Sequence, residues 1–214
     1  SALALAACPI ALWVGDLAMA ANYARELLYH SGRHYLPLWN AYGSGFCHVV
    51  AIRSETGSPV GHIAVGELAE PNVTFRFLTG LIEVAGALAH AGRVTEGLAV
   101  VEAGIEQSEE GWLTPELLRL KGELLLLQST SAAAETAENL FRQALDGARR
   151  QDMLSWELRA ATSLARLLRH QGRPVDAIAC LQPVYNRFTE GFVTADLIAA
   201  KQILEEAGDP GDIR

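Results

Sequence analysis

Gly172-Arg-Pro-Val-Asp-Ala-Ile-Ala179 is the clearest copy of a short motif that recurs along this chain of 214 residues. Gly92-Arg-Val-Thr-Glu-Gly-Leu-Ala99 resembles it about 80 residues earlier, and Gly57-Ser-Pro-Val-Gly-His-Ile-Ala64 matches it almost position for position. Gly15-Asp-Leu-Ala is a weaker copy, and a fifth turn without the glycine is expected near Ser129-Thr-Ser131. Repetition at roughly 40 residues is typical of stacked helix pairs.

Apolar residues on both sides of each motif follow the helical period. Before the last copy, Ala161, Leu164 and Leu168 recur at spacings of three and four, which places them on one helix face. Gly172 supplies the left-handed residue that ends the first helix, and Pro174 suits the first turn of the second. A helix pair this short cannot bury both of its faces alone, so neighbouring pairs are expected to stack.

The pattern predicts an all-α protein, a right-handed superhelical array of about five antiparallel helix pairs with a capping helix at the C-terminal end. The predicted helices cover residues 3–14, 16–30, 33–53, 58–69, 73–90, 93–108, 114–128, 132–150, 153–170, 173–187 and 192–207. Residues 1–207 are expected to form a single helical repeat domain, and residues 208–214 a flexible tail.

Composition narrows the function classes. Hydrophobic residues make up 50% of the chain, which is ample material for a packed interior, while aromatic residues make up 7%. The formal net charge of −8 argues against a nucleic-acid binder, because phosphate binding needs a basic surface. No partner of that class is therefore expected.

The cysteines and the first residues point to a cytoplasmic protein. Cys8, Cys47 and Cys180 are far apart and form no metal-ligand or disulfide pattern, so we expect reduced thiols and no metal site. Residues 1–15 are apolar, but Asp16 cuts the run short of a membrane span and no basic segment precedes it. We expect no membrane association, and interpret the chain as a fragment of a longer protein.

A second set of residues carries a family resemblance. Ala137, Phe141 and Ala144 recur at spacings of four and three on what would be the second helix of a pair. Gly122 and Ala165 would each occupy a small-residue position on the first helix of a pair. These residues resemble tetratricopeptide repeats, although the first-helix tryptophan of that family is missing from most copies here. The resemblance implies that the first helix of each pair lines a concave groove.

A longer run is similar to the C-terminal helical region of large bacterial signalling proteins. It comprises Leu113-Thr-Pro-Glu-Leu-Leu-Arg-Leu-Lys-Gly-Glu-Leu-Leu-Leu126, Ala137-Glu-Asn-Leu-Phe-Arg-Gln-Ala-Leu145, Ser155-Trp-Glu-Leu-Arg-Ala-Ala-Thr-Ser-Leu-Ala-Arg-Leu167 and Thr189-Glu-Gly-Phe-Val-Thr-Ala-Asp-Leu197, with Cys8-Pro-Ile-Ala-Leu-Trp-Val-Gly-Asp-Leu17 upstream. Proteins of that kind carry a central signalling ATPase, preceded by a winged-helix DNA-binding domain or an adenylate/guanylate cyclase domain. The resemblance implies that this chain is a regulatory arm, and no phosphate-binding G-x-x-x-x-G-K-[ST] motif occurs in it.

Arginines supply the first candidate site. Arg159, Arg166 and Arg169 share one stripe of the helix predicted over 153–170, opposite its leucines, and the repeat alignment brings Arg119 alongside. Such a stripe in a concave groove suits an acidic peptide or a small acidic ligand, because the guanidinium fork matches a carboxylate. The alternative is a solvated helix face, or pairing with Glu116 and Glu123 across the groove.

Aromatic residues supply the second candidate. Trp39, Tyr42 and Phe46 recur at helical spacing, so they fit either a partner-binding hot spot or the core between stacked pairs. Gly43 and Gly45 beside them suggest close approach of two helix backbones.

No catalytic constellation or cofactor motif stands out, so the chain is expected not to be an enzyme and to hold no cofactor. His90 and His170 both precede a repeat glycine by two residues, which indicates a structural role for them. The leading hypothesis is a protein-interaction or ligand-sensing arm that acts on its own ATPase or output domains. The alternative is a scaffold for homo-oligomerisation.

Overall fold

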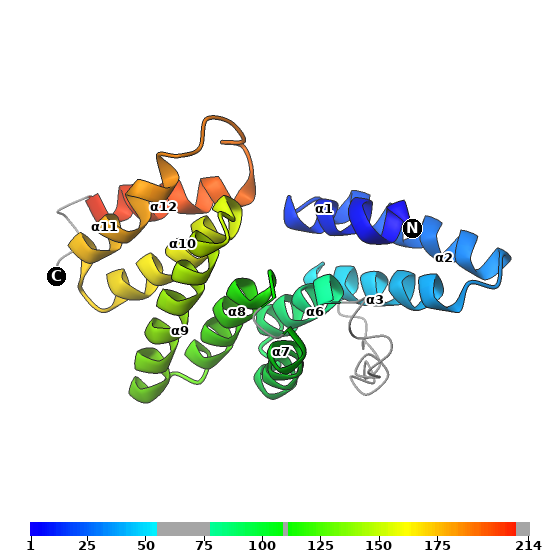
Figure 1. The fold of residues 1–214 in the computed structure, drawn as a ribbon, viewed down its shortest axis with the longest axis horizontal. Helices are drawn as coiled ribbons and strands as arrows, with labels where there is room; N and C mark the ends of the chain where they lie inside the picture. The colour runs from blue at the N-terminus through cyan, green and yellow to red at the C-terminus, as the bar shows by residue number, and fades with distance from the viewer. Residues whose placement is uncertain (55–77, 109–110, 209–214) are drawn as a thin grey trace. The chain divides into compact units, whose positions relative to one another are not determined.

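The computed structural model describes residues 1–54, 78–108 and 111–208, which form helices and the turns between them (Figure 1). No β-strand occurs within these ranges, so the all-α prediction is confirmed for them. The chain divides into two compact units, Ser1–Glu109 and Glu110–Arg214. The helix predicted over 58–69 and the tail from residue 209 onward lie outside the described residues.

Unit 1 contains a short π-helical turn and five described α-helices. They are η1 (Leu3–Ala7), α1 (Cys8–Trp13), α2 (Leu17–Arg33), α3 (Pro37–Arg53), α6 (Leu78–His90) and α7 (Val94–Ser108). Neighbours along the chain pack against one another: α1 on α2, α2 on α3, and α6 on α7, while α3 also packs against α6. Leu28 of α2 lies where a Cβ on Gly43 of α3 would stand, only 2.8 Å away, which explains the glycine in that helix.

Unit 2 carries the predicted arginine stripe. Its helices are α8 (Thr114–Leu126), α9 (Ser131–Arg150), α10 (Leu154–His170), α11 (Pro174–Tyr185) and α12 (Ala195–Gly208). Each packs against the next, and α10 also packs against α8 and α12. The helices α8, α10 and α12 therefore form one layer, with α10 at its centre.

The repeat glycines within the described ranges adopt the backbone conformation that the motif predicted, whereas Gly57 lies outside those ranges. Gly15, Gly92 and Gly172 have φ values of +82°, +69° and +73°. At the last of these, the Arg173 amide donates to the Leu168 carbonyl at 2.9 Å, which closes the helix end in a Schellman arrangement. Glycine is favoured here because the left-handed region costs an L side chain free energy.

Three non-glycine residues also have a positive φ at the end of a helix. Ser129, at the fifth predicted turn, has φ +55°, and Asp152 and Tyr35 have +55° and +52°. The sequence indicated the turn at Ser129 only by its distance from the neighbouring motifs, because no glycine marks it. Thr130 then caps α9, its hydroxyl oxygen accepting a hydrogen bond from the Ala133 amide at 3.1 Å.

The first predicted helix, 3–14, is divided. Residues Leu3–Ala7 form a π-helical turn, and α1 begins at Cys8 with Pro9 in its first turn. Proline lacks the amide hydrogen that would continue the α-helical ladder, so the change of hydrogen-bond pattern falls where proline is tolerated.

Small residues allow the helices of unit 2 to approach closely. Ala137, Phe141 and Ala144 are all buried in a core that includes Ala165 and Leu164. The Phe141 ring lies against Gly122 of α8, and a Cβ there would come within 2.4 Å of the ring. Gly122 of α8 and Phe141 of α9 are thus in direct contact.

Candidate functional site

The predicted arginine stripe lies on the layer formed by α8, α10 and α12. Arg159, Arg166 and Arg169 lie on α10, and Arg119 lies on α8. Each of the four forms an ion pair with a carboxylate. Pairing with Glu116 and Glu123, the alternative that the sequence left open, accounts for three of the four arginines.

Glu116 and Arg119 form the buried centre of the layer. Nε and Nη2 of Arg119 donate to the two carboxylate oxygens of Glu116 at 2.8 and 2.9 Å. Arg159 reaches the same carboxylate from α10, with 2.8 Å between its Nη1 and Oε1. Glu116 is 1% exposed and Arg119 is 9% exposed, so this contact is withdrawn from solvent. One carboxylate therefore joins two guanidinium groups on two helices.

Ser163 connects the centre to the next pair along α10. Its hydroxyl donates to Glu123 at 2.5 Å and accepts from Nη1 of Arg119 at 3.3 Å. Arg166 approaches the same Glu123 carboxylate at 3.5 Å. Sequence reasoning missed Ser163, although its position four residues after Arg159 and three before Arg166 places it on the same stripe.

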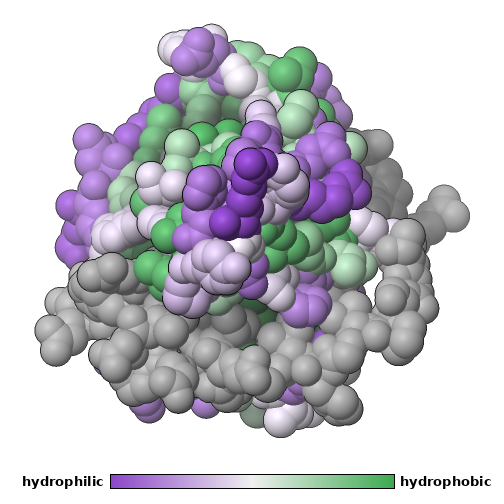
Figure 2. Space-filling view, turned by 90° about the vertical axis from the view of Figure 1, so that its right-hand side faces the viewer, coloured by the Kyte–Doolittle hydropathy of each residue, from purple (hydrophilic) through white to green (hydrophobic). Residues whose placement is uncertain are grey.

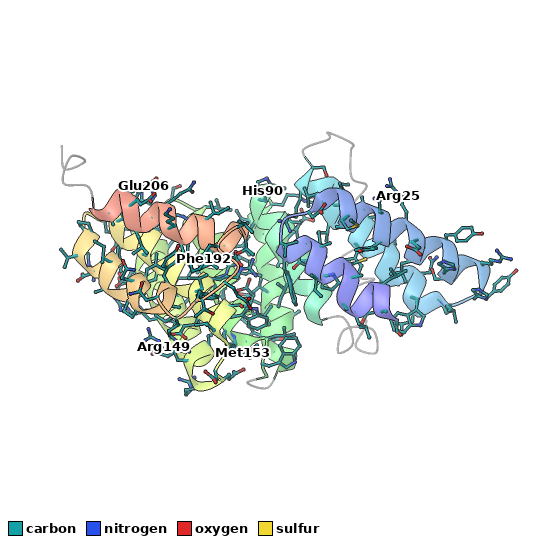
Figure 3. The ribbon with its side chains drawn as sticks, turned by 90° about the horizontal axis from the view of Figure 1, so that it is seen from above. Arg25, His90, Arg149, Met153, Phe192 and Glu206 are labelled. Atoms are coloured by element: carbon teal, nitrogen blue, oxygen red, sulfur yellow. The ribbon has the colours of Figure 1, made fainter. Side chains whose placement is uncertain are left out.

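Helix α12 contributes two acids that the sequence did not single out. Asp196 lies 3.6 Å from Nε of Arg159. Glu206, which lies near the end of α12 (Figure 3), pairs with Arg169. Nε of Arg169 is buried without a hydrogen-bond partner. No spacing rule could have linked these residues, because the contact depends on how α12 crosses α10.

Burial and charge act in opposite directions on the central pair. Burial alone would raise the pKa of Glu116, but the neighbouring Arg119 and Arg159 hold this pKa below its ordinary value. Burial would lower the pKa of Arg119, whereas Glu116 and the more distant Glu123 and Asp196 raise it overall. Both groups are charged at neutral pH. Each of the four arginines has an acid beside it, so the layer carries no surplus of positive charge.

The aromatic candidates lie in unit 1. Tyr42 and Phe46 are each 1% exposed, while Trp39 is half-buried. The ring centroids of Trp39 and Tyr42 are 5.7 Å apart, and those of Tyr42 and Phe46 are 6.4 Å apart. Tyr42 therefore belongs to the core between helices, which is the alternative that the sequence left open for this group.

The thiols supply no nucleophile. Burial raises the pKa of Cys8 to about 11, with a smaller contribution from nearby Cys47, and burial raises the pKa of Cys180 to about 11. These thiols are protonated at neutral pH.

Within the part of the chain that the structure describes, no group of His, Cys, Asp or Glu is arranged to hold a metal ion. None of the described helices is both long and apolar enough to cross a membrane.

Comparison of the chain with protein-family models, with curated proteins and with solved structures gives no match.

Proposed function

We propose that this chain is a non-catalytic binding arm whose helix pairs continue one another as a right-handed, tetratricopeptide-like array. In this proposal the layer of α8, α10 and α12 faces the partner, an acidic peptide segment of another protein or of another domain of the same protein. The larger protein would be a bacterial signalling protein with an ATPase and an output domain, as the resemblance of residues 113–197 implies.

The observation that carries the proposal is the exposure of the outer ion pairs of the layer. The Arg166 side chain is 44% exposed, and its ion pair with Glu123 is 3.5 Å long. An ion pair of this kind contributes little to stability, so Arg166 can pair with a carboxylate of the partner at small cost, while Glu123 keeps its hydrogen bond from Ser163. The buried Glu116–Arg119 pair stays in place beneath and fixes the helices that present the outer arginines.

Binding would act by population shift. A partner that pairs with Arg159 and Arg166 favours whichever arrangement of the larger protein leaves this layer accessible. Its regulatory effect then equals the difference between its affinities for the two arrangements.

A titration with a glutamate-rich peptide tests the proposal on the protein itself. Arg166→Glu should weaken binding roughly tenfold or more, since a hydrogen bond to a charged group is replaced by repulsion. Arg150→Glu is the matched control, because Arg150 is exposed and lies outside the layer. Binding that both variants reduce equally would show non-specific attraction and overturn the proposal.

Self-association is the second candidate function, and exposed apolar side chains favour it. Leu5, Ile10 and Val14 of unit 1 are each about half exposed. On the face of the molecule in Figure 2, hydrophobic residues lie between hydrophilic ones. Light scattering over a range of concentrations separates the candidates. The binding arm is expected to be a monomer, whereas a dimer that Ile10→Glu dissociates would support the scaffold.

A further inference from the structure

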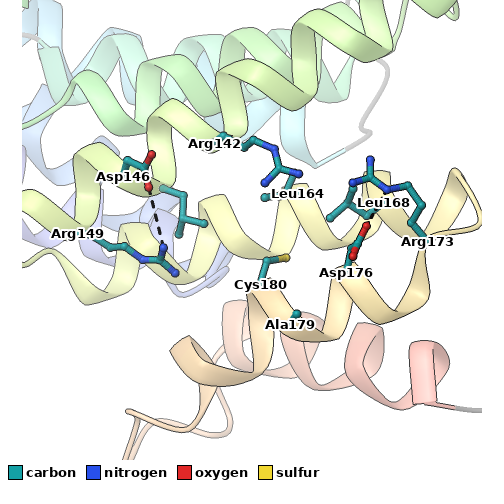
Figure 4. Close-up of a pocket in the computed structure, with 10 residues that line it drawn as sticks. Arg142, Asp146, Arg149, Leu164, Leu168, Arg173, Asp176, Ala179 and Cys180 are labelled. Carbon is teal, nitrogen blue, oxygen red and sulfur yellow. Dashed lines mark hydrogen bonds and ion pairs between the residues drawn. The ribbon is translucent and has the colours of Figure 1, made fainter.

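A second group of arginines surrounds a furrow on the other side of α10. Helices α9 and α11 both pack on α10, and a cavity of about 410 Å³ lies between them (Figure 4). Its walls are one face of each outer helix, with residues at helical spacing, and its floor is α10. The lining residues are Arg142, Leu145, Asp146, Arg149, Leu164, Leu168, Arg173, Asp176, Ala179 and Cys180.

The guanidinium groups at the rim keep unused donors. Arg142 donates through Nε and Nη2 to Glu138, which leaves Nη1 without a hydrogen bond. Arg173 uses Nε and Nη1 but not Nη2, and Arg149 donates only through Nε, to Glu157. The three side chains are between 39% and 48% exposed. Each can therefore donate to a further acceptor without breaking its present hydrogen bonds.

The two acids that line the furrow compete only weakly, while Glu138 and Glu157 keep the hydrogen bonds described above. Asp146 lies 4.0 Å from Arg149, which is too long for a hydrogen bond, and its side chain is 63% exposed. Asp176 pairs with Arg173 at 2.9 Å, three residues along the chain, and is also largely exposed. Exposed pairs of this kind contribute little to stability, so an incoming anion loses little by competing with them.

The floor of the furrow is apolar. Leu145, Leu164 and Leu168 lie beneath it as buried side chains of the unit 2 core, and the apolar surface that a ligand can touch belongs to Ala179 and Cys180. Cys180 adds a thiol whose pKa burial raises to about 11, so it is neutral and does not repel an anion. A cavity in which polar donors surround an apolar floor has the character and size of a small-molecule site.

We propose that this furrow binds a small organic anion, with its carboxylate held by Arg142 and Arg173 and its short apolar body resting on Ala179 and Cys180. The inference does not depend on the proposed peptide face, because Leu164 and Leu168 leave α10 on the side opposite Arg159 and Arg166.

Hexanoate is a suitable probe, because it combines one carboxylate with a short hydrocarbon chain. It should bind the intact protein with a Kd of about millimolar, as expected for so small a ligand, and shift NMR signals of residues around the furrow. Inorganic phosphate carries the negative charge without the hydrocarbon chain, and 1-hexanol carries the chain without the charge, so each tests one part of the recognition alone. If either binds as tightly as hexanoate, the proposal of an organic carboxylate is overturned.

Two variants locate the site. Arg142→Gln removes one donor group while Arg173 still holds Glu138, and should weaken hexanoate binding roughly tenfold. Ala179→Leu fills the furrow from an exposed position and should abolish binding with the charges intact. Arg150→Gln is the control and should bind as the parent does. Equal binding by the parent and Ala179→Leu, or no hexanoate binding at all, would overturn the inference. Glutamate-rich peptide binding should persist in Ala179→Leu, so the two sites can fail independently.

Discussion

At the scale of single residues, Arg119 shows why a buried charge is costly to disturb. Its partner Glu116 is almost fully buried, so removing the guanidinium leaves a carboxylate that only Arg159 still neutralises. We expect Arg119→Met to lower the free energy of unfolding by roughly 3–5 kcal/mol. Arg166→Met removes an exposed partner of Glu123 and should cost less than about 1 kcal/mol. Urea denaturation measures both; equal losses would contradict the assigned burial.

Glu116 makes the stability of the folded protein depend on pH. The pKa of Glu116 is lower in the folded protein than in the unfolded chain. The ionised carboxylate therefore stabilises the fold fully above the unfolded-state pKa of about 4.3, and this stabilisation is lost as the pH falls through the folded-state pKa. The stability difference between the parent and Glu116→Gln should therefore shrink below about pH 4.3. Arg142 and Arg173 also lower the pKa of Glu138, so the variant keeps part of the slope. A constant difference across that range would refute the assignment.

Buried alanines set the distance between helices. Ala165 and Ala137 are fully buried, so a leucine at either position overpacks the core. We expect Ala165→Leu and Ala137→Leu each to destabilise the protein by roughly 1–3 kcal/mol. Ala132→Leu adds the same side chain at an exposed position of α9 and serves as the control. Melting temperatures that match the parent in both core variants would mean that the helix register is wrong.

At the scale of elements, the turns isolate a conformational effect. A Cβ on Gly172 would meet no atom within 4 Å, so Gly172→Ala tests the left-handed backbone alone. We expect it to lower stability by roughly 1–2 kcal/mol. Ser129 has a positive φ with a side chain already present, so Ser129→Gly should change stability in the opposite direction. Chemical denaturation gives both values, and the same sign for both would contradict the explanation.

Helix boundaries could be predicted where residues close in sequence determine where a helix begins and ends. Gly172 and Pro174 end one helix and begin the next through backbone conformations that only nearby residues determine. The π-helical turn at 3–7 was not predictable in this way, because the apolar pattern does not distinguish it from an α-helical turn. The sequence also placed three arginines on one stripe, but their partners Asp196 and Glu206 lie on α12, and their contact depends on tertiary packing.

The furrow is a second feature that could not be predicted from the sequence. Arg142 lies on α9 and Arg173 directly precedes α11, and they gave no signal as a pair, because only the packing of α9 and α11 on α10 brings them to one cavity. Periodicity identifies which face of a helix is buried. It does not identify which polar residues of two helices meet.

At the scale of the whole molecule, the all-α prediction covers residues beyond the described ranges. Far-UV circular dichroism of the complete chain should show a helical spectrum without a strand component, because helical periodicity lies on both sides of each repeat turn. A substantial strand signal would refute this expectation. Thermal unfolding followed at the same wavelength then reports the combined stability of both units.

The contact between Gly122 and Phe141 has an evolutionary consequence. Since a Cβ at residue 122 would stand 2.4 Å from the aromatic ring, a side chain gained there forces the ring of Phe141 to move or to be replaced. The route that costs least stability passes through a smaller residue at 141 first, so the order of substitution matters as well as the outcome. In homologous chains, the residues at these two positions should therefore covary, with an aromatic at 141 found only beside glycine at 122.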